Sequence, residues 1–256
     1  TLFVFIFPIF WEWPFTKRDK TSLSSSPSWD HPFGTDELGK DGLGRVMRGT
    51  QRSLEIAAIA AFLITTIGVF LGAIAGYFRG WIDSILMRFT DLVLTLPLLV
   101  IVAVVSVGYP GAPWYTIPII LGLVAWTGLA RIVRAEFMSL REKEFVEAAR
   151  AVGARDRRII FRHILPNLAG PIIVAATLSI AGTIITETAL SFLGLGVRAP
   201  DVSLGFLIQS GLTAFKTRPW LFWFPSAAIV IICLCVNFVG DGLRDAFDPK
   251  QNRIKA

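Results

Sequence analysis

The chain has 256 residues, of which 54% are hydrophobic and only 17% are charged, and its mean hydropathy is +0.61. Soluble domains carry about 25% charged residues, so this composition excludes both an ordinary soluble globule and a disordered chain. The net charge of +6 is compatible with nucleic acid or a membrane surface as a partner, depending on where the charge lies. Cys233 and Cys235 are two positions apart and would point to different faces of a helix, so neither a disulfide nor a metal site is predicted.

Residues 1–11 are apolar but too few to cross a bilayer. No basic segment precedes them and no small-residue cleavage site follows, so they do not form a signal peptide. The chain also begins with Thr1 rather than Met. We interpret residues 1–11 as the remnant of a first span, followed by an extracytoplasmic loop with an amphipathic segment over residues 12–55.

Residues 34–41 of this loop approach the spacing of a phosphate-binding P-loop. Asp41, however, stands where Ser or Thr should hold magnesium. Asp36 and Glu37 would also repel a phosphate group. The segment is therefore expected to be an ordered outer loop and not a nucleotide site.

Charge-free runs predict the membrane spans. Residues 56–78, 163–186 and 219–240 each have the length of a single span, which needs about 20 apolar residues. Residues 92–130 are too many for one span and contain a turn cluster over residues 107–115, so we divide them into two spans joined by a hairpin. With the truncated first span, the prediction is an all-α bundle of six spans. Residues 202–215 are charge-free but short, which favours a re-entrant or surface segment.

The distribution of Lys and Arg predicts the orientation. Residues 131–162 hold nine of them, whereas the hairpin at residues 107–115 holds none, so 131–162 are assigned to the cytoplasm. Alternation then places a short turn at residues 79–91 and both termini inside, with a cytoplasmic tail at 250–256. Residues 12–55 and 187–218 fall outside. The predicted location is the bacterial cytoplasmic membrane.

The cytoplasmic segment predicts two short helices joined at a glycine. Ser139 and Glu142 have the spacing of a capping box for a helix that ends at Ala151. Gly153 is suited to a left-handed cap, and Asp156 to the start of a second helix that Pro166 would end.

The small residues of this segment indicate that it docks a protein. A basic amphipathic connector on lipid headgroups is the plainer alternative. Small side chains let another body approach closely, and a bare surface made of them favours a docking partner over lipid. The small residues concerned are Ala148, Ala149, Ala151, Gly153 and Ala154.

Glu147-Ala148-Ala149, Gly153 and Leu165-Pro166 together resemble the EAA loop of ABC importer permeases, with His163 standing where the family pattern has Ile. Three further stretches resemble the C-type inner-membrane subunit of the oligopeptide and dipeptide (peptide/nickel) importer family. They are residues 31–45, residues 187–196, and residues 240–249.

The resemblance implies a type I importer permease with a transmembrane core at residues 56–249 and an EAA coupling loop at 136–167. The expected partners are a second permease, two ATPase subunits or a fused one, a peptide-binding protein outside and the lipid bilayer, without nucleic acid. ATP and magnesium would be bound by the ATPases, this chain would bind no cofactor and catalyse nothing, and no metal site is predicted. The residues expected to contact the ATPases are Glu147, Ala148, Ala149, Gly153, Arg155, Asp156, His163, Leu165 and Pro166.

Glu187, with Thr183 and Thr186 nearby, is a candidate for the translocation path, because an acid near membrane depth is often functional. The alternative is an interfacial acid with structural hydrogen bonds.

Three other functions are alternatives to peptide import. A nickel importer of the same family stays open, although the two histidines lie far apart. An ion-gradient transporter would need acids in the middle of spans and an inverted repeat, and an intramembrane hydrolase would need a nucleophile and a base at span depth. The sequence presents neither pattern.

Overall fold

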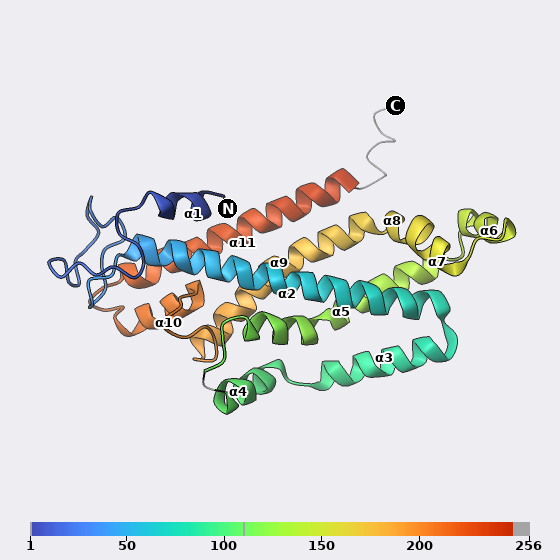
Figure 1. Cartoon of the computed structure of the whole chain (residues 1–256), viewed down its shortest axis with the longest axis horizontal. Helices are drawn as coiled ribbons and strands as arrows, with labels where there is room; N and C mark the ends of the chain where they lie inside the picture. The colour runs from blue at the N-terminus through green and yellow to red at the C-terminus, as the bar shows by residue number, and fades with distance from the viewer. Residues whose placement is uncertain (1, 110, 248–256) are drawn as a thin grey trace. The chain divides into compact units, whose positions relative to one another are not determined.

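The computed structural model describes residues 2–109 and 111–247, and the regular elements in them are helices (Figure 1). The predicted tail at residues 250–256, Pro249 and Pro110 lie outside the described residues. The elements are α1 (Leu2–Ile6), η1 (Phe7–Ile9), α2 (Gly42–Phe78), α3 (Gly80–Thr95), α4 (Leu98–Gly108), α5 (Thr116–Leu140), α6 (Glu144–Ala151), α7 (Asp156–Arg158), η2 (Ile159–Ile164), α8 (Leu165–Asn167), α9 (Ala169–Phe192), α10 (Leu204–Thr213) and α11 (Trp220–Phe247).

Four helices, α2, α5, α9 and α11, are long and apolar enough to cross a membrane. A fifth span is formed if α3 and α4, which meet at an angle of 67°, count as one broken span. These elements match the five complete spans predicted from the sequence. The sixth span is not confirmed, because the described part of residues 1–11 contains only the five-residue α1 and the three-residue η1.

The prediction of a short turn at residues 79–91 is wrong, because α3 runs through these residues as a helix. The charges that ended the apolar run are paired within the protein. Asp83 accepts two hydrogen bonds from the Arg134 guanidinium, at 2.5 and 2.6 Å, and Asp91 accepts one from Arg131 at 2.6 Å. Paired carboxylates do not have to be exposed at the end of a helix, so the helix continues past them.

Pro97 marks the bend between α3 and α4. Leu96 before it has an extended backbone, as steric contact with a following proline favours. Pro118 and Pro171 lie in the first turns of α5 and α9, where a missing N–H costs no helical hydrogen bond. Pro225, by contrast, lies well inside a described helix, α11.

The chain forms two compact units. The first draws its described residues from Thr1–Ala58, Val102–Ile117 and Ala181–Cys235, and the second from Ile59–Ile101, Pro118–Ile180 and Val236–Ala256. In the first unit, Leu204 and Leu207 of α10 pack with Val46 of α2 in an apolar core.

The segment before α2 is ordered by side-chain contacts. His31 is buried, and its two ring nitrogens lie 2.9 Å from an oxygen of Asp41 and 3.3 Å from an oxygen of Asp19. Asp41 also accepts the Gly44 N–H at 2.7 Å, which caps the start of α2. The segment is therefore an ordered loop, as predicted, and the helix that follows begins at Gly42, before the apolar run itself.

Hydrogen bonds from Thr21 act on one carboxylate of this segment. The Thr21 hydroxyl and backbone N–H donate to Asp19 at 2.5 and 2.8 Å. Bonds to the charged form favour it, so they hold the pKa of Asp19 below its ordinary value.

Candidate functional site

Helix α6 begins later than predicted. Ser139 belongs to the last turn of α5, and α6 starts at Glu144 after an extended Lys143 that makes no side-chain cap. The capping box of Ser139 and Glu142 is therefore wrong: the Glu142 N–H bonds only the Ser139 carbonyl, in a turn. The apolar face of α5 remains packed as far as Phe137 and Leu140, and this packing extends α5 through the predicted start.

Gly153 ends α6 in a left-handed conformation, as predicted, with a φ of 80°. The Ala154 N–H bonds the Ala149 carbonyl at 3.0 Å, and the Gly153 N–H bonds the Arg150 carbonyl at 2.9 Å. These two bonds form a Schellman motif, which satisfies the last carbonyls of α6. The chain thus turns sharply between the two short helices.

Asp156 begins the second short helix, as predicted, but Pro166 does not end it. The helix passes from α7 through the π-helical turn η2 into α8, and the break lies at Leu168. Pro166 occupies the first turn of α8, where its missing N–H is tolerated.

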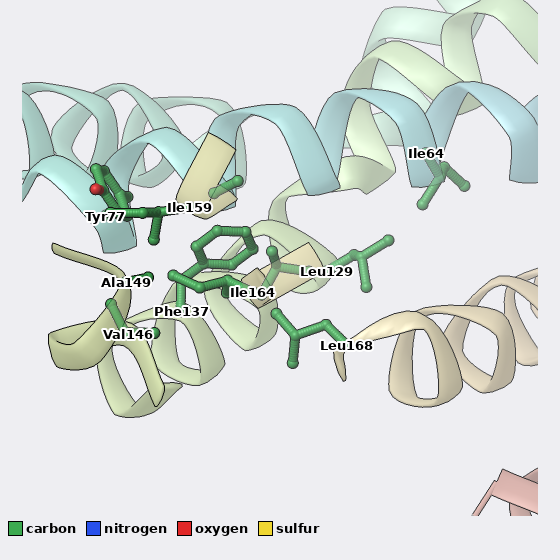
Figure 2. Packing of buried hydrophobic residues seen from close by; sticks show 11 residues of the cluster. Ile64, Tyr77, Leu129, Phe137, Val146, Ala149, Ile159, Ile164 and Leu168 are labelled. Carbon is green, nitrogen blue, oxygen red and sulfur yellow. The ribbon is translucent and has the colours of Figure 1, made fainter. Parts of the chain in front are cut away.

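The inner face of this loop packs on the bundle. Val146 and Ile159 are fully buried together with Phe137 of α5, and Ile164 and Leu168 continue the same cluster (Figure 2). In Figure 2, Phe137 lies in the middle of these side chains and Tyr77 of α2 at the edge. The loop is therefore packed against the ends of the helices.

The outer face of the loop carries small and charged residues. Ala148, Ala151 and Gly153 are exposed, and Val152 between them is 85% exposed. Ala149 differs from the prediction of a bare surface, because it is buried against the bundle. One face of the eight-residue helix α6 packs on the bundle and the opposite face is exposed. Ala149 lies three residues after Val146 and therefore shares its buried face.

The remaining predicted contact residues surround this outer face. Glu147, Arg155, Asp156 and Pro166 are exposed, whereas His163 and Leu165 are half-buried. Arg155, Arg157, Arg158 and Arg162 make the second helix strongly basic.

Sequence reasoning missed how the loop is attached to α2. The Tyr77 hydroxyl donates to Asp156 at 2.5 Å, and Arg141 donates to the Tyr77 carbonyl at 2.5 Å. Arg79 donates to the Met138 carbonyl at 2.9 Å and pairs with Glu142 at 2.7 Å. The only signal in the sequence was the high arginine content of residues 131–162, and this content does not specify which groups of α2 the segment would contact.

Glu187 lies in a cluster of serines in the other unit and is fully buried. The Ser191 hydroxyl donates to it at 2.7 Å, and the Ser53 hydroxyl at 3.4 Å. Ser53 also accepts the Leu204 N–H at 3.2 Å, and Ser203 caps α10 by accepting the Phe206 N–H at 3.2 Å. The carboxylate thus holds together α2, α9 and the start of α10.

The three candidate path residues do not share one surface. Thr183 is buried, and the Thr186 hydroxyl donates to the Gly182 carbonyl of its own helix at 2.9 Å. A cavity of about 720 Å³ lies elsewhere, in the second unit, and is lined by residues of α5, α8, α9 and α11, including Ile132, Asn167 and Arg244. Within the described residues, no group of three His, Cys, Asp or Glu side chains is placed to hold a metal ion.

The family model "binding-protein-dependent transport system inner membrane component" matches residues 68–253, which include the whole loop and its helices. The chain belongs to this family. It is thus a transport subunit of the inner membrane, and its apolar helices agree with a multi-pass protein.

Curated relatives extend the match over almost the whole chain. The oligopeptide transport system permease protein of Mycobacterium tuberculosis is 42% identical over 238 residues, covering 93% of this chain and 82% of the relative. The protein of the same name in Haemophilus influenzae is 42% identical, and the match covers 98% of this chain and 81% of that relative. A putative peptide permease protein of Brucella suis is 40% identical, and the match covers 96% of this chain and 82% of that relative.

Solved structures share the fold. A methionine ABC transporter in an inward-facing conformation has a chain that matches with a TM-score of 0.65 at 19% identity, covering 80% of this chain and 97% of that chain. An amino acid ABC transporter solved with histidines matches with a TM-score of 0.61 at 15% identity, covering 80% of this chain and 94% of that chain. The helical architecture is therefore that of ABC importer permeases.

Proposed function

We propose that this chain is the permease subunit that carries peptides across the membrane in an ATP-driven importer, with α6–α8 as its docking loop for the ATPases. The observation that carries the proposal is the two-sided loop. Its inner face is buried on the helix ends through Val146, Ile159 and Ile164, and its outer face presents Ala148, Ala151 and Gly153. A surface of small residues on a well-packed support suits a close-fitting protein partner.

The loop works as a rigid connector between ATPase and spans. ATP and magnesium are bound by two ATPase subunits or a fused one, and closure of the ATPases moves the loop. Glu147 and the arginines from Arg155 to Arg162 make polar contacts with them. The permease residues hydrolyse no ATP, so this chain supplies movement and the transport path and no catalytic group.

The other partners follow from the orientation. The loop and both termini are cytoplasmic, and the ordered segment before α2 faces outside, toward a peptide-binding protein. A second, homologous permease completes the path. Peptides are the substrate because the relatives that match over nearly the whole chain are named as oligopeptide or peptide permeases.

A bulky residue at Gly153 tests the docking loop. A Cβ at this position would meet no atom within 4 Å inside the chain, so a large side chain would project outward. The Gly153→Trp complex should retain its subunits on purification in mild detergent but transport peptide at least about tenfold more slowly per ATP hydrolysed, as a coupling loss of about 1.4 kcal/mol gives. Uptake and ATP hydrolysis are measured in proteoliposomes.

Gly153→Ala is the matched control. It has the same strained left-handed backbone as Gly153→Trp but only a methyl group, so it separates backbone strain from obstruction of the docking surface. It should transport peptide like the wild type. Wild-type coupling in Gly153→Trp would contradict the docking role.

The substrate is tested with dialanine, trialanine, pentaalanine and Ni²⁺ as separate probes on the complete complex. We expect at least one alanine peptide to stimulate ATP hydrolysis and to accumulate in the vesicles. Stimulation by Ni²⁺ alone would contradict peptide import and support the nickel branch of the family.

A further inference from the structure

The loop α6–α8 is covalently continuous with α5 and α9 but not with α2. Movement of the loop therefore reaches α2 through noncovalent contacts, either directly or by way of α5, whose backbone packs closely against Gly72 and Gly76 of α2. In the second unit the loop contacts the last turn of α2 directly at Tyr77, whereas Arg79, just after α2, bonds the Met138 carbonyl of α5.

Tyr77 makes three kinds of contact there. Its ring is buried, 3% exposed, in the cluster that contains Val146, Ala149 and Ile159 of the loop. Its hydroxyl donates to the Asp156 carboxylate at 2.5 Å. Its carbonyl, one of those left without a partner at the end of a helix, accepts from Arg141 at 2.5 Å.

These contacts differ in what they transmit. Apolar packing is not directional and tolerates sliding of one surface over another. A hydrogen bond to a charged acceptor is short and directional, and it fixes the position of the donor relative to the acceptor. Asp156 is the first residue of α7, so its carboxylate moves with the second helix of the loop.

We infer that Tyr77 is a positioning residue that carries the movement of the ATPase-docking loop to α2 through its hydroxyl bond to Asp156. This inference rests on the proposed function of the loop. Two cationic groups support the arrangement: the guanidinium groups of Arg141 and Arg150 lie 5.5 and 5.8 Å from the centre of the Tyr77 ring. They keep the ring in place from the side of the loop.

Tyr77→Phe removes only the hydroxyl group and retains the ring in its packed site. In proteoliposomes that contain the full complex, we measure peptide moved per ATP hydrolysed, using whichever of the three alanine peptides the wild type imports fastest. The ratio should fall by about twofold to thirtyfold, the range for residues that link two coupled sites. Copurification of the ATPases and basal ATP hydrolysis should stay at wild-type levels.

Tyr115→Phe is the matched control, because it removes the same group from an exposed tyrosine that belongs to the first unit, whereas the loop belongs to the second. It should leave the ratio unchanged. Asp156→Ala should lower the ratio, and the double variant Tyr77→Phe/Asp156→Ala should lower it no further than Asp156→Ala alone, since both remove one bond.

Several outcomes would overturn the inference. They are a wild-type ratio in Tyr77→Phe, additive losses in the double variant, or loss of the ATPases or of the folded permease in Tyr77→Phe, which would make the hydroxyl merely structural. Gly153→Trp separates the two proposals. If it uncouples and Tyr77→Phe does not, only the positioning role fails; if Gly153→Trp transports normally, the docking loop itself is wrong and the positioning role falls with it.

Discussion

At the scale of single residues, the environment of Glu187 decides its chemistry more than its position in the sequence does. An acid near membrane depth suggested the translocation path. In the structure the side chain is enclosed, with hydroxyl donors from Ser53 and Ser191 and with Ser203 close to Ser191, while a role in the path stays a prediction. These contacts join three segments that are far apart in sequence, as structural hydrogen bonds would.

Removing the Glu187 carboxylate should destabilise the permease. Glu187→Ala would leave buried serine hydroxyls without a partner, at a cost of about 1–3 kcal/mol, whereas Glu187→Gln keeps an acceptor and should cost less. Thermal unfolding of the purified protein in detergent measures the difference. Glu12→Ala, at an exposed acid, serves as the control. Equal stability of Glu187→Ala and wild type would refute the structural role, and reduced transport in a fully stable Glu187→Gln would favour the path.

The segment before α2 should lose order in acid. Thr21 lowers the pKa of Asp19 in the folded segment below the unfolded value of about 3.9, so the stabilisation is complete above that pH. It is lost as the pH falls below the unfolded value toward the lowered one. Limited proteolysis of the segment between pH 7 and pH 3 should show increasing cleavage. Asp19→Asn should flatten this dependence, and an unchanged profile would exclude Asp19 as its source.

At the scale of the elements, charged residues mislead when they are paired. Residues 79–91 looked like a turn because Asp83, Arg88 and Asp91 interrupt the apolar run. The pairs of Asp83 with Arg134 and of Asp91 with Arg131 join α3 to α5, and α3 continues to Thr95. Only tertiary contacts supply such partners, so hydropathy found this span but began it at residue 92, whereas the bent helix pair that can form it begins at Gly80.

The two ion pairs between α3 and α5 should contribute unequally. Asp83 is 13% exposed and makes two bonds, whereas Asp91 and Arg131 are each 50% exposed. Asp83→Asn should therefore cost about 1–3 kcal/mol, and Asp91→Asn, the matched control, less than about 1 kcal/mol. Unfolding of the two variants in the same detergent gives the comparison. A greater loss in Asp91→Asn would contradict the burial argument.

At the scale of the whole molecule, four single helices and one bent pair within the described residues are long and apolar enough to cross a membrane. Their order fits the predicted orientation, in which the segment before α2 faces outside and α6–α8 face the cytoplasm. Family membership supports an inner-membrane transport subunit, and the orientation remains a prediction.

Labelling of introduced cysteines tests the orientation. Cys233 and Cys235 are free thiols and are first replaced by Ser. A membrane-impermeant maleimide should then label Ser26→Cys in intact cells, but Arg157→Cys only after permeabilisation, since both positions are exposed and lie on opposite sides of the predicted topology. Labelling of Arg157→Cys in intact cells would reverse the assignment.

The sequence by itself determined the apolar runs, the glycine turn at Gly153 and the spacing of the EAA loop, because these depend on local hydropathy, backbone freedom and residue order. Tertiary structure decided the rest. It turned Ala149 inward, extended α3 through its charges, enclosed Glu187 among serines and joined Tyr77 to Asp156 across 79 positions. Each of these features depends on which groups meet in space. The residue type alone does not show whether a polar side chain is paired, enclosed or exposed.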